Sequence, residues 1–377
     1  MISAAAAYLS GIRSSHTSVL KVTAYKDGVL QGELPVVSAT LNLDGTSDVI
    51  RVATVEAAID DEGTATRDAV ESLSVENGTI QIEHGVAFGE TLIAPLVTIA
   101  TLRVESIEES LSGATRTYKA YDRSLLLQEH LLPTPRPMND TYVNLITTLV
   151  NETLPGETVT IEGGIDTALA PSAGKSMNRG DNRLSRIQEF AEALGAWFVC
   201  DPDGSFRLAV WPETGTSVWD LDAGTEGVLV NAEYAYSRRE QYNAVGIDFT
   251  PASGSQWSGF VYMWDNDVAS PTYYDGTFGK RNIFFSEEYD HLPTQTEAED
   301  VARRKLYEYS GAARSVEVTA LYNPLLVPGD RVTVKLDDGD TETHFIESLT
   351  FQFGKTAAMK VTGRLDRAPG SFGLQVG

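Results

Sequence analysis

Residues 323–334 read Asn-Pro-Leu-Leu-Val-Pro-Gly-Asp-Arg-Val-Thr-Val, a turn-rich run that leads into alternating apolar and polar residues. Pro328 and Gly329 indicate a turn, because proline fixes φ and glycine tolerates positive φ. From Arg331 onward, the alternation is typical of a strand with one buried face. Turns followed by strands recur on both sides of this block, so we expect a mainly β protein.

Around this block we expect a β-domain over residues 216–377 that contains one helix. The helix runs from Thr294 to Tyr309, and Thr294 and Glu297 are placed as a capping box. Its buried stripe is predicted to contain Ala298, Val301, Ala302, Leu306 and Tyr309. Strands are predicted at Val316–Leu321, Arg331–Leu336, His344–Phe353 and Met359–Arg364, with a turn at Asp337–Asp340.

Another β-domain is predicted over residues 1–125. Its apolar and β-branched runs are separated by Asp-Gly, Glu-Gly, Asn-Gly and Ser-Gly pairs, which are turn signals. Short strands at such spacing are typical of a barrel or a sandwich. The predicted strands are Val19–Tyr25, Val36–Leu43, Val49–Ala53, Thr79–Glu83, Leu96–Ile107 and Thr115–Tyr121.

In the middle of the chain, the sequence of residues 126–215 predicts an α+β domain. Asn139 and Asp140 follow a proline-rich bend and are expected to cap one helix. A second helix should begin after Asn182 and end at Gly195, in the position where helices favour glycine. An apolar hairpin follows, with strands Ala196–Cys200 and Phe206–Trp211.

Composition excludes several classes of protein. The chain has 377 residues with 29 basic and 53 acidic side chains, a formal net charge of −24, which argues against specific nucleic-acid binding. The most apolar stretch, Leu92–Leu102, is too short for a membrane span, and the N-terminus lacks the features of a secretory signal. The single cysteine, Cys200, lies in an apolar run and is expected to be a buried thiol in a protein that folds in a cytoplasm.

The sequence contains no convincing motif for catalysis, a cofactor or a metal. Gly174-Lys175-Ser176 lacks the earlier glycine of a phosphate-binding loop, and no nucleophile elbow occurs. Paired carboxylates are unavoidable by chance among 53 acidic residues. The histidines lack metal-binding spacing; they are His16, His84, His130, His291 and His344. We therefore expect neither an enzyme nor a cofactor-binding or metal-binding protein.

Two stretches of the sequence have an unusual composition, one in charged residues and one in aromatic residues. Residues 36–110 contain 14 acidic and 3 basic side chains, a local charge of 3 − 14 = −11, which indicates a solvated face or a surface that repels polyanions. Residues 257–289 hold 10 of the 33 aromatic residues, which fits core packing, a protein interface or a sugar-stacking surface. The candidate residues for such an interface are Trp257, Phe260, Trp264, Tyr273 and Tyr274.

The order of these elements resembles that of bacteriophage tail hub proteins. Residues 182–206 resemble the helix, glycine and hairpin unit of these hubs. Residues 298–365 are similar to the last barrel of the baseplate hub and late control protein D families. Leu92–Ile107 and Tyr121-Asp122-Arg123 look like minor tail proteins of phages that infect actinobacteria. The resemblance covers most of the chain, although segment 257–289 has no counterpart in it.

This resemblance implies two tube-like β-barrel domains that flank a helix-hairpin α+β domain. It implies a homotrimer that forms a pseudo-sixfold ring at the virion tail tip and joins the tail tube, or a distal tail protein ring, to a tail fibre or spike. The ring would touch the tape-measure protein and enclose a channel, lined by the acidic stretch 36–110, through which DNA passes during ejection. Such a structural protein is non-enzymatic and is assembled in the host cytoplasm.

Two other classes of function stay open. Trp257, Trp264 and the Tyr273-Tyr274 pair would suit a carbohydrate-binding, receptor-recognition module of a virion, because aromatic faces stack on sugars. A glycoside hydrolase that uses two carboxylates is the third class.

Overall fold

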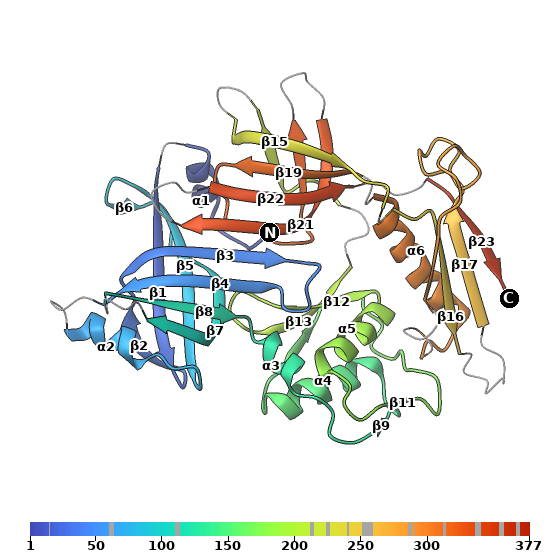
Figure 1. The fold of residues 1–377 in the computed structure, drawn as a ribbon, viewed down its shortest axis with the longest axis horizontal. Coiled ribbons are helices and arrows are strands. Elements are labelled where there is room, and N and C mark those ends of the chain that lie inside the picture. The colour runs from blue at the N-terminus through green and yellow to red at the C-terminus, as the bar shows by residue number, and fades with distance from the viewer. Residues whose placement is uncertain are drawn as a thin grey trace.

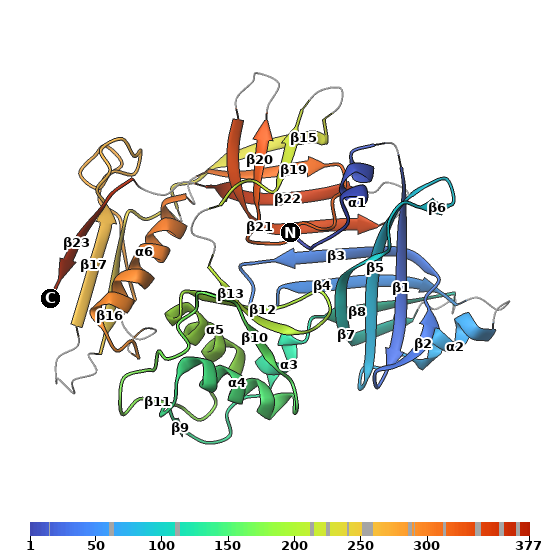
Figure 2. The same ribbon diagram turned by 180° about the vertical axis from the view of Figure 1, so that it is seen from behind.

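The computed structural model is dominated by antiparallel strands (Figures 1 and 2). It describes residues 1–14, 16–59, 64–109, 114–211, 215–223, 227–239, 241–250, 259–285, 289, 291–311, 314–335, 341–353, 358–366 and 370–377. Fourteen of the described strands join in one sheet that runs through both the N-terminal and the C-terminal β-regions. Sheets of two, three and four strands complete the fold.

The N-terminal region confirms the six predicted strands and adds helices that were not predicted. α1 buries Tyr8 and Ile12, and α2 lies in the connection between β4 and β5. Both helices have fewer than ten residues, so neither has the repeated apolar spacing that predicts a helix. The elements are α1 (Ala6–Ile12), β1 (Thr17–Lys26), β2 (Val29–Glu33), β3 (Val36–Asp44), β4 (Arg51–Ala58), α2 (Thr64–Ser72), β5 (Gly78–Phe88), β6 (Thr91–Leu92), β7 (Val97–Glu109) and β8 (Thr115–Tyr121).

The middle region confirms both predicted helices and the hairpin. The Asn182 side chain caps the second helix by accepting hydrogen bonds from two backbone N–H groups, and Gly195 beyond its end has φ +67°. The first helix is capped by Thr141, one residue later than expected, while Asp140 accepts from Asn144. The elements are α3 (Ser124–Glu129), β9 (Arg136–Pro137), α4 (Tyr142–Thr153), β10 (Val159–Ile161), β11 (Ser176–Met177), α5 (Arg183–Ala193), β12 (Ala196–Cys200) and β13 (Phe206–Val210).

The C-terminal region confirms the predicted helix and all four predicted strands. Thr294 accepts a hydrogen bond from the Glu297 backbone, as expected of a capping residue, whereas the turn at 337–340 lies outside the described residues. The elements are β14 (Trp219–Asp222), β15 (Leu229–Tyr236), β16 (Ala244–Phe249), β17 (Gly259–Asp265), β18 (Asn282–Phe285), α6 (Gln295–Gly311), β19 (Arg314–Ala320), β20 (Arg331–Lys335), β21 (Thr341–Phe353), β22 (Ala358–Leu365) and β23 (Phe372–Val376).

The prediction of two separate tube-like barrels needs a correction, because the described strands form no closed barrel. In the N-terminal region β2 and β3 do not pair with each other, so that region stays open. The edge of β3 pairs instead with β21, with Leu41 opposite Phe351. Local strand patterns predict the strands, but they do not determine which edges meet. The two β-regions consequently form one continuous sheet.

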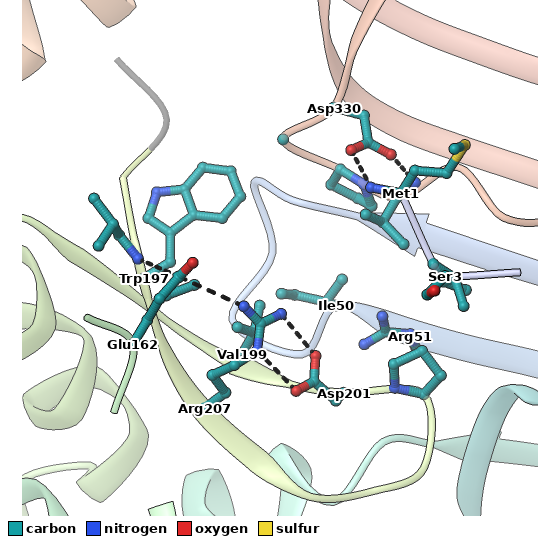
Figure 3. A pocket seen from close by; sticks show the side chains of 17 residues that line it. Met1, Ser3, Ile50, Arg51, Glu162, Trp197, Val199, Asp201, Arg207 and Asp330 are labelled. Carbon is teal, nitrogen blue, oxygen red and sulfur yellow. Dashed lines mark hydrogen bonds and ion pairs between the residues drawn. The ribbon is translucent and has the colours of Figure 1, made fainter. Parts of the chain in front are cut away.

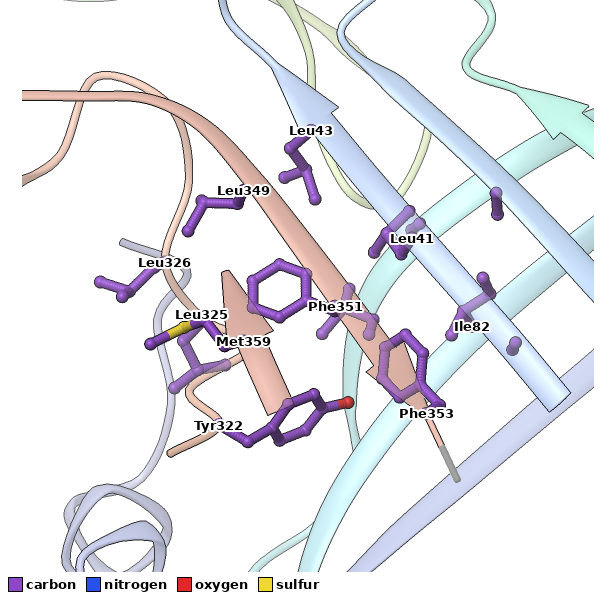
Figure 4. Close-up of a cluster of buried hydrophobic side chains, with 14 of the residues drawn as sticks. Leu41, Leu43, Ile82, Tyr322, Leu325, Leu326, Leu349, Phe351, Phe353 and Met359 are labelled. Carbon is purple, nitrogen blue, oxygen red and sulfur yellow. The ribbon is translucent and has the colours of Figure 1, made fainter. Parts of the chain in front are cut away.

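Two apolar cores divide the chain. The first lies under the large sheet, and Figure 4 shows its centre, where Leu41 and Ile82 of the N-terminal region pack near Phe351 and Met359 of the C-terminal region. The second core joins the α+β region to the small sheet β18-β16-β17-β23, which α6 covers on one face. Residues 216–377 are thus shared between the two cores.

A buried histidine links helix α1 to the large sheet. His84 on β5 has no exposed surface; one ring nitrogen contacts the Tyr8 hydroxyl and the other lies 2.7 Å from the Ser18 hydroxyl. Burial, with a smaller contribution from His16, lowers the pKa of His84 to about 3. His84 is therefore neutral in the folded protein at pH values where an exposed histidine gains its proton.

We expect the protein to lose stability as the pH falls below 6.5. The unfolded chain binds a proton at His84 near pH 6.5, whereas the folded protein resists it until about pH 3, so stability present above 6.5 is lost on acidification. Between pH 7.5 and 5 the loss from this residue is about 2 kcal/mol. Urea unfolding at both pH values measures it. A His84→Gln variant should lose less over this interval, and equal losses in both proteins would contradict the assignment.

Candidate functional site

Eight neighbouring strands of the large sheet form a strip that crosses both β-regions in the order β15-β19-β22-β21-β3-β4-β8-β7 (Figure 1). Side chains alternate between its two faces. On β3, for example, Leu41 and Leu43 are buried in the core, whereas Thr40 and Asn42 lie on the other face. The cross-strand register carries this alternation across the junction, because Thr350 lies opposite Asn42 and donates a hydrogen bond to its amide oxygen at 2.9 Å.

The outer face of the strip, here called the polar face, consists mainly of hydroxyl and amide side chains. Its charged side chains include the ion pair between Lys360 and Glu317, at 2.7 Å. The neutral members are Ser38, Thr40, Asn42, Thr54, Ser106, Thr117, Asn231, Thr319, Ser348, Thr350, Gln352 and Thr362. The charged members of the same rows are Asp44, Glu56, Arg103, Glu108, Lys119, Glu233, Glu317 and Lys360.

The carboxylates of the acidic stretch 36–110 do not gather on this face. Glu56 and Glu108 lie there, and Glu83 forms an ion pair with Lys21 at 3.1 Å between β5 and β1. Asp44, the last residue of β3, also lies on this face, opposite Ser348. Others lie on turns and on α2, namely Asp48, Asp68, Glu71, Glu76 and Glu90, while 60–62 lie outside the described residues. The polar face is thus only slightly acidic.

Each end of the strip has a backbone edge without a strand partner among the described residues. β15 pairs only with β19, and its Val230 side chain is 66% exposed. β7 pairs with β5 up to Arg103 and with β8 from Arg103 onward, so the segment from Val104 to Glu109 has a strand on one side only. Exposed edges of this kind are sites where another chain can add a strand.

The small sheet carries an aromatic face on the side away from α6. On β17, Val261 and Met263 point into the second core, and the alternating Phe260, Tyr262 and Trp264 point outward. The rings of Phe260, Tyr262 and Phe284 are within 24° of parallel, with centroids 6.0 to 6.4 Å apart. Phe284, contributed by β18, is 56% exposed.

Glycines, which have no side chain, allow these aromatic rings to lie close to the backbone of the sheet. A Cβ atom added to Gly246 would come within 2.4 Å of Phe284, and one added to Gly373 within 2.0 Å of Trp264. The Tyr262 hydroxyl fixes the centre of the face, since it lies 2.7 Å from the Tyr274 hydroxyl and donates to the Asn282 amide oxygen at 2.9 Å. Desolvation and the Tyr274 contact raise the pKa of Tyr262, so its hydroxyl stays protonated.

The structure brings three of the five predicted interface residues together. Phe260 and Trp264 lie on β17, and Tyr274 packs beside Trp264 with ring centroids 5.9 Å apart. Tyr273 is half-buried in the neighbouring loop, and Trp257 lies outside the described residues. Sequence reasoning missed Tyr262, although the alternation in Gly-Phe-Val-Tyr-Met-Trp places it between Phe260 and Trp264.

A cavity of about 530 Å³ lies where the N-terminal segment, the β12–β13 hairpin and the loop before β20 meet (Figure 3). Its charged groups already have partners in the protein. Arg207 pairs with Asp201 at 2.9 Å and with Glu162 at 3.7 Å, and Asp330 pairs with the amino group of Met1. The Arg51 guanidinium donates to the Cys200 carbonyl. Among the lining residues no nucleophile is paired with a general base, so the cavity shows no catalytic arrangement.

The part of the chain that the structure describes contains no metal site, and its cysteine is buried. No group of three His, Cys, Asp or Glu side chains there could hold a metal ion. Cys200 is buried, as expected, and burial raises the pKa of its thiol to about 12. None of the described helices is long and apolar enough to cross a membrane.

Substitution of Gly373 by alanine should disturb the aromatic face. The added Cβ would meet the Trp264 ring at 2.0 Å, and the ring must move, at an expected cost of about 1–3 kcal/mol of unfolding free energy. Urea unfolding and near-UV circular dichroism measure the two effects. Gly163→Ala is the matched control because a Cβ there meets nothing within 4 Å. Equal behaviour of the two variants would show that the ring does not rest on Gly373.

Compared by sequence, the chain matches no protein-family model and no curated protein. Its fold is similar to the tail protein from Neisseria meningitidis MC58, with TM-score 0.62 and 13% identity over 92% of this chain and 97% of that one. The 43 kDa tail protein of prophage MuSo2 from Shewanella oneidensis is similar with a TM-score of 0.59 and 13% identity, over 93% of this chain and 98% of that one. The E. coli c3393 protein is a type VI secretion component with structural similarity to the T4 tail proteins gp27 and gp5. Its TM-score to this chain is 0.53, with 13% identity over 92% of this chain and 77% of that one. The chain thus has the fold of phage tail proteins.

Proposed function

We propose that this chain is a structural, non-enzymatic hub at the tip of a phage tail or of a phage-derived injection device. Three copies would form a ring that joins the tail tube, or a distal tail protein ring, to a fibre or spike. The observation that carries the proposal is the eight-stranded strip with one free edge at each end. The likeness in fold to tail proteins supports it. Parts 1–125, 126–215 and 216–377 would be the units of each subunit.

The geometry of the strip favours closure into a ring. Seven successive antiparallel pairings separate β15 from β7, so these two strands run in opposite directions. Rotation about an axis along the strands preserves strand direction, and β15 of one copy would therefore meet β7 of the next copy antiparallel. Three copies would give a closed sheet of 3 × 8 = 24 strands without an exposed edge. Two β-regions in each copy would make the ring pseudo-sixfold.

The polar face would line the channel of this ring. Hydroxyl and amide groups present no cluster of cations, so they would not release counterions from DNA and hold it. Five carboxylates outnumber three cations on this face, which gives a weak repulsion of phosphate: they are Asp44, Glu56, Glu108, Glu233 and Glu317 against Arg103, Lys119 and Lys360. DNA would pass without specific binding, next to the tape-measure protein, in a virion component assembled in the host cytoplasm.

The purified protein should have a mass near 123 kDa by light scattering, which is 3 × 40.9 kDa. Val230→Lys should shift it toward 41 kDa, because a lysine on the β15 edge opposes strand addition. Val268→Lys, at a residue that is 80% exposed and belongs to neither edge, is the control and should stay trimeric. A trimer that tolerates Val230→Lys would contradict closure through β15.

A second candidate function is carbohydrate binding by the aromatic face, as part of receptor recognition. Carbohydrate binding is favoured by the nearly parallel rings of Phe260, Tyr262 and Phe284, since flat aromatic faces stack on the faces of sugar rings. Gly246 leaves room for the Phe284 ring to lie close to the sheet.

If this second function is correct, the protein should sediment with purified cell-wall polysaccharide. Trp264→Ala and Phe284→Ala should weaken binding roughly tenfold, because each removes a stacking ring. Val268→Ala changes an exposed side chain outside the described ring contacts and should bind normally. Binding that all three variants retain would rule out the aromatic face as the sugar site.

A further inference from the structure

Four cations gather on one surface of this strongly acidic chain. Arg238 and Arg239 follow β15, and Lys280 and Arg281 precede β18, some forty residues later. Arg281 donates from its two terminal nitrogens to the carbonyls of Arg238 and Arg239, and Arg238 donates to the Phe278 carbonyl. These contacts bring the two segments side by side. We call this surface the cationic patch.

A buried amide holds the two segments in place. Asn243 has no exposed surface, and its side chain donates to the carbonyls of Thr272, at 2.9 Å, and Gly279, at 3.0 Å. Its amide oxygen accepts from the Arg281 backbone at 2.8 Å. All three contacts cross between segments that are distant in sequence, so the loop that carries Lys280 and Arg281 has a fixed conformation.

Among the residues that the structure describes, three of the four cations of the patch have no carboxylate partner. Arg238 lies over the Phe278 ring at 4.6 Å, Lys280 over Tyr274 at 4.4 Å and Arg281 over Tyr242 at 5.1 Å, so aromatic rings orient the cations without neutralising them. Among the described residues, the ion pair between Lys280 and Asp275, at 2.8 Å, is the one carboxylate contact of the patch. Arg238 and Arg239 are exposed to solvent.

The position of the patch at the end of β15 determines what it would face in the ring. β15 of one copy would run antiparallel to β7 of the next, so the residues after Tyr236 would lie beside the point where β7 leaves β5. That point is at Arg103 and Val104. Glu76 and Glu105 are exposed there, and the Arg103 guanidinium donates to the backbone carbonyl of Glu76 at 2.9 Å. These two carboxylates and one cation leave the surface with a net charge of 1 − 2 = −1.

We propose that the cationic patch binds the Glu76 and Glu105 surface of the next copy and thereby completes the subunit interface. This inference rests on the proposed ring. A head-to-tail ring needs two different complementary surfaces on each copy, and the patch and the acidic surface have opposite charge. Copies with a net charge of −24 repel each other at long range, and a local cationic surface offsets that repulsion at one contact.

Reversal of charge at the patch tests the proposal. Arg238→Glu combined with Arg239→Glu should raise the concentration needed for trimerisation roughly tenfold or more, because like charges then face each other. Arg179→Glu combined with Lys335→Glu makes the same change in net charge at two exposed cations elsewhere and should leave the trimer intact. Light scattering over a dilution series measures both effects.

A mixing experiment identifies the partner surface. Glu76→Lys combined with Glu105→Lys should also block the trimer of that variant alone. Mixed with the patch variant, it should form complexes larger than 41 kDa that neither variant forms alone, because every junction between the two variants joins surfaces of opposite charge. A closed ring of three copies would still contain one junction between identical variants, where like charges meet, so the mixed ring should be less stable than the unmodified trimer. A trimer that survives patch reversal would overturn this inference and leave the ring proposal standing. An unmodified protein that stays at 41 kDa at every concentration and salt would overturn the ring itself.

Discussion

The pairing of β3 with β21 is the interaction on which the rest of the structure depends. Its antiparallel register runs from Asp44 opposite Ser348 to Ala39 opposite Phe353, between residues about three hundred positions apart. Without it the chain would have two open β-regions, each with an additional exposed edge. With it, the core beneath Leu41 and Phe351 is common to both regions, and the polar face extends unbroken across them. Among the described residues, the free edges of the strip itself are then those of β15 and of β7 beyond Arg103, at its opposite ends.

The sequence predicted the strands well because the alternation of apolar and polar residues is local. β3 and β8 begin and end within one residue of their predicted bounds. The open sheet was not predictable in this way, because the pairing of β3 with β21 depends on which edges meet after long connections close. α1 and α2 were missed for a related reason: each is a short helix whose formation depends on tertiary packing, such as the burial of Tyr8 and Ile12.

The candidate surfaces show the same division between local and non-local information. Phe260 and Trp264 could be selected from composition, and Tyr262 from the alternation along β17. Phe284 joins them only because β18 pairs in parallel with β16, which no local pattern indicates. The cationic patch was likewise beyond prediction, since Arg238 and Arg281 are brought together by the buried amide of Asn243.

The two halves of the structure meet through aromatic and polar contacts, and the polar contacts have a consequence for the proposed assembly. Trp197 and Trp211 of the hairpin pack against Phe345 of β21, with ring centroids 6.0 and 6.4 Å apart. The Arg123 guanidinium donates to the Gly204 carbonyl at 2.9 Å and stacks over the Phe206 ring, and Arg331 pairs with Asp366 at 2.6 Å beside helix α6. The Arg331 guanidinium is buried, so a rotation of one core against the other that broke its pairing would leave a charged donor unsatisfied, at several kcal/mol. In the proposed ring each subunit would have to meet two neighbours at a fixed angle, and these arginine contacts would help to hold that angle.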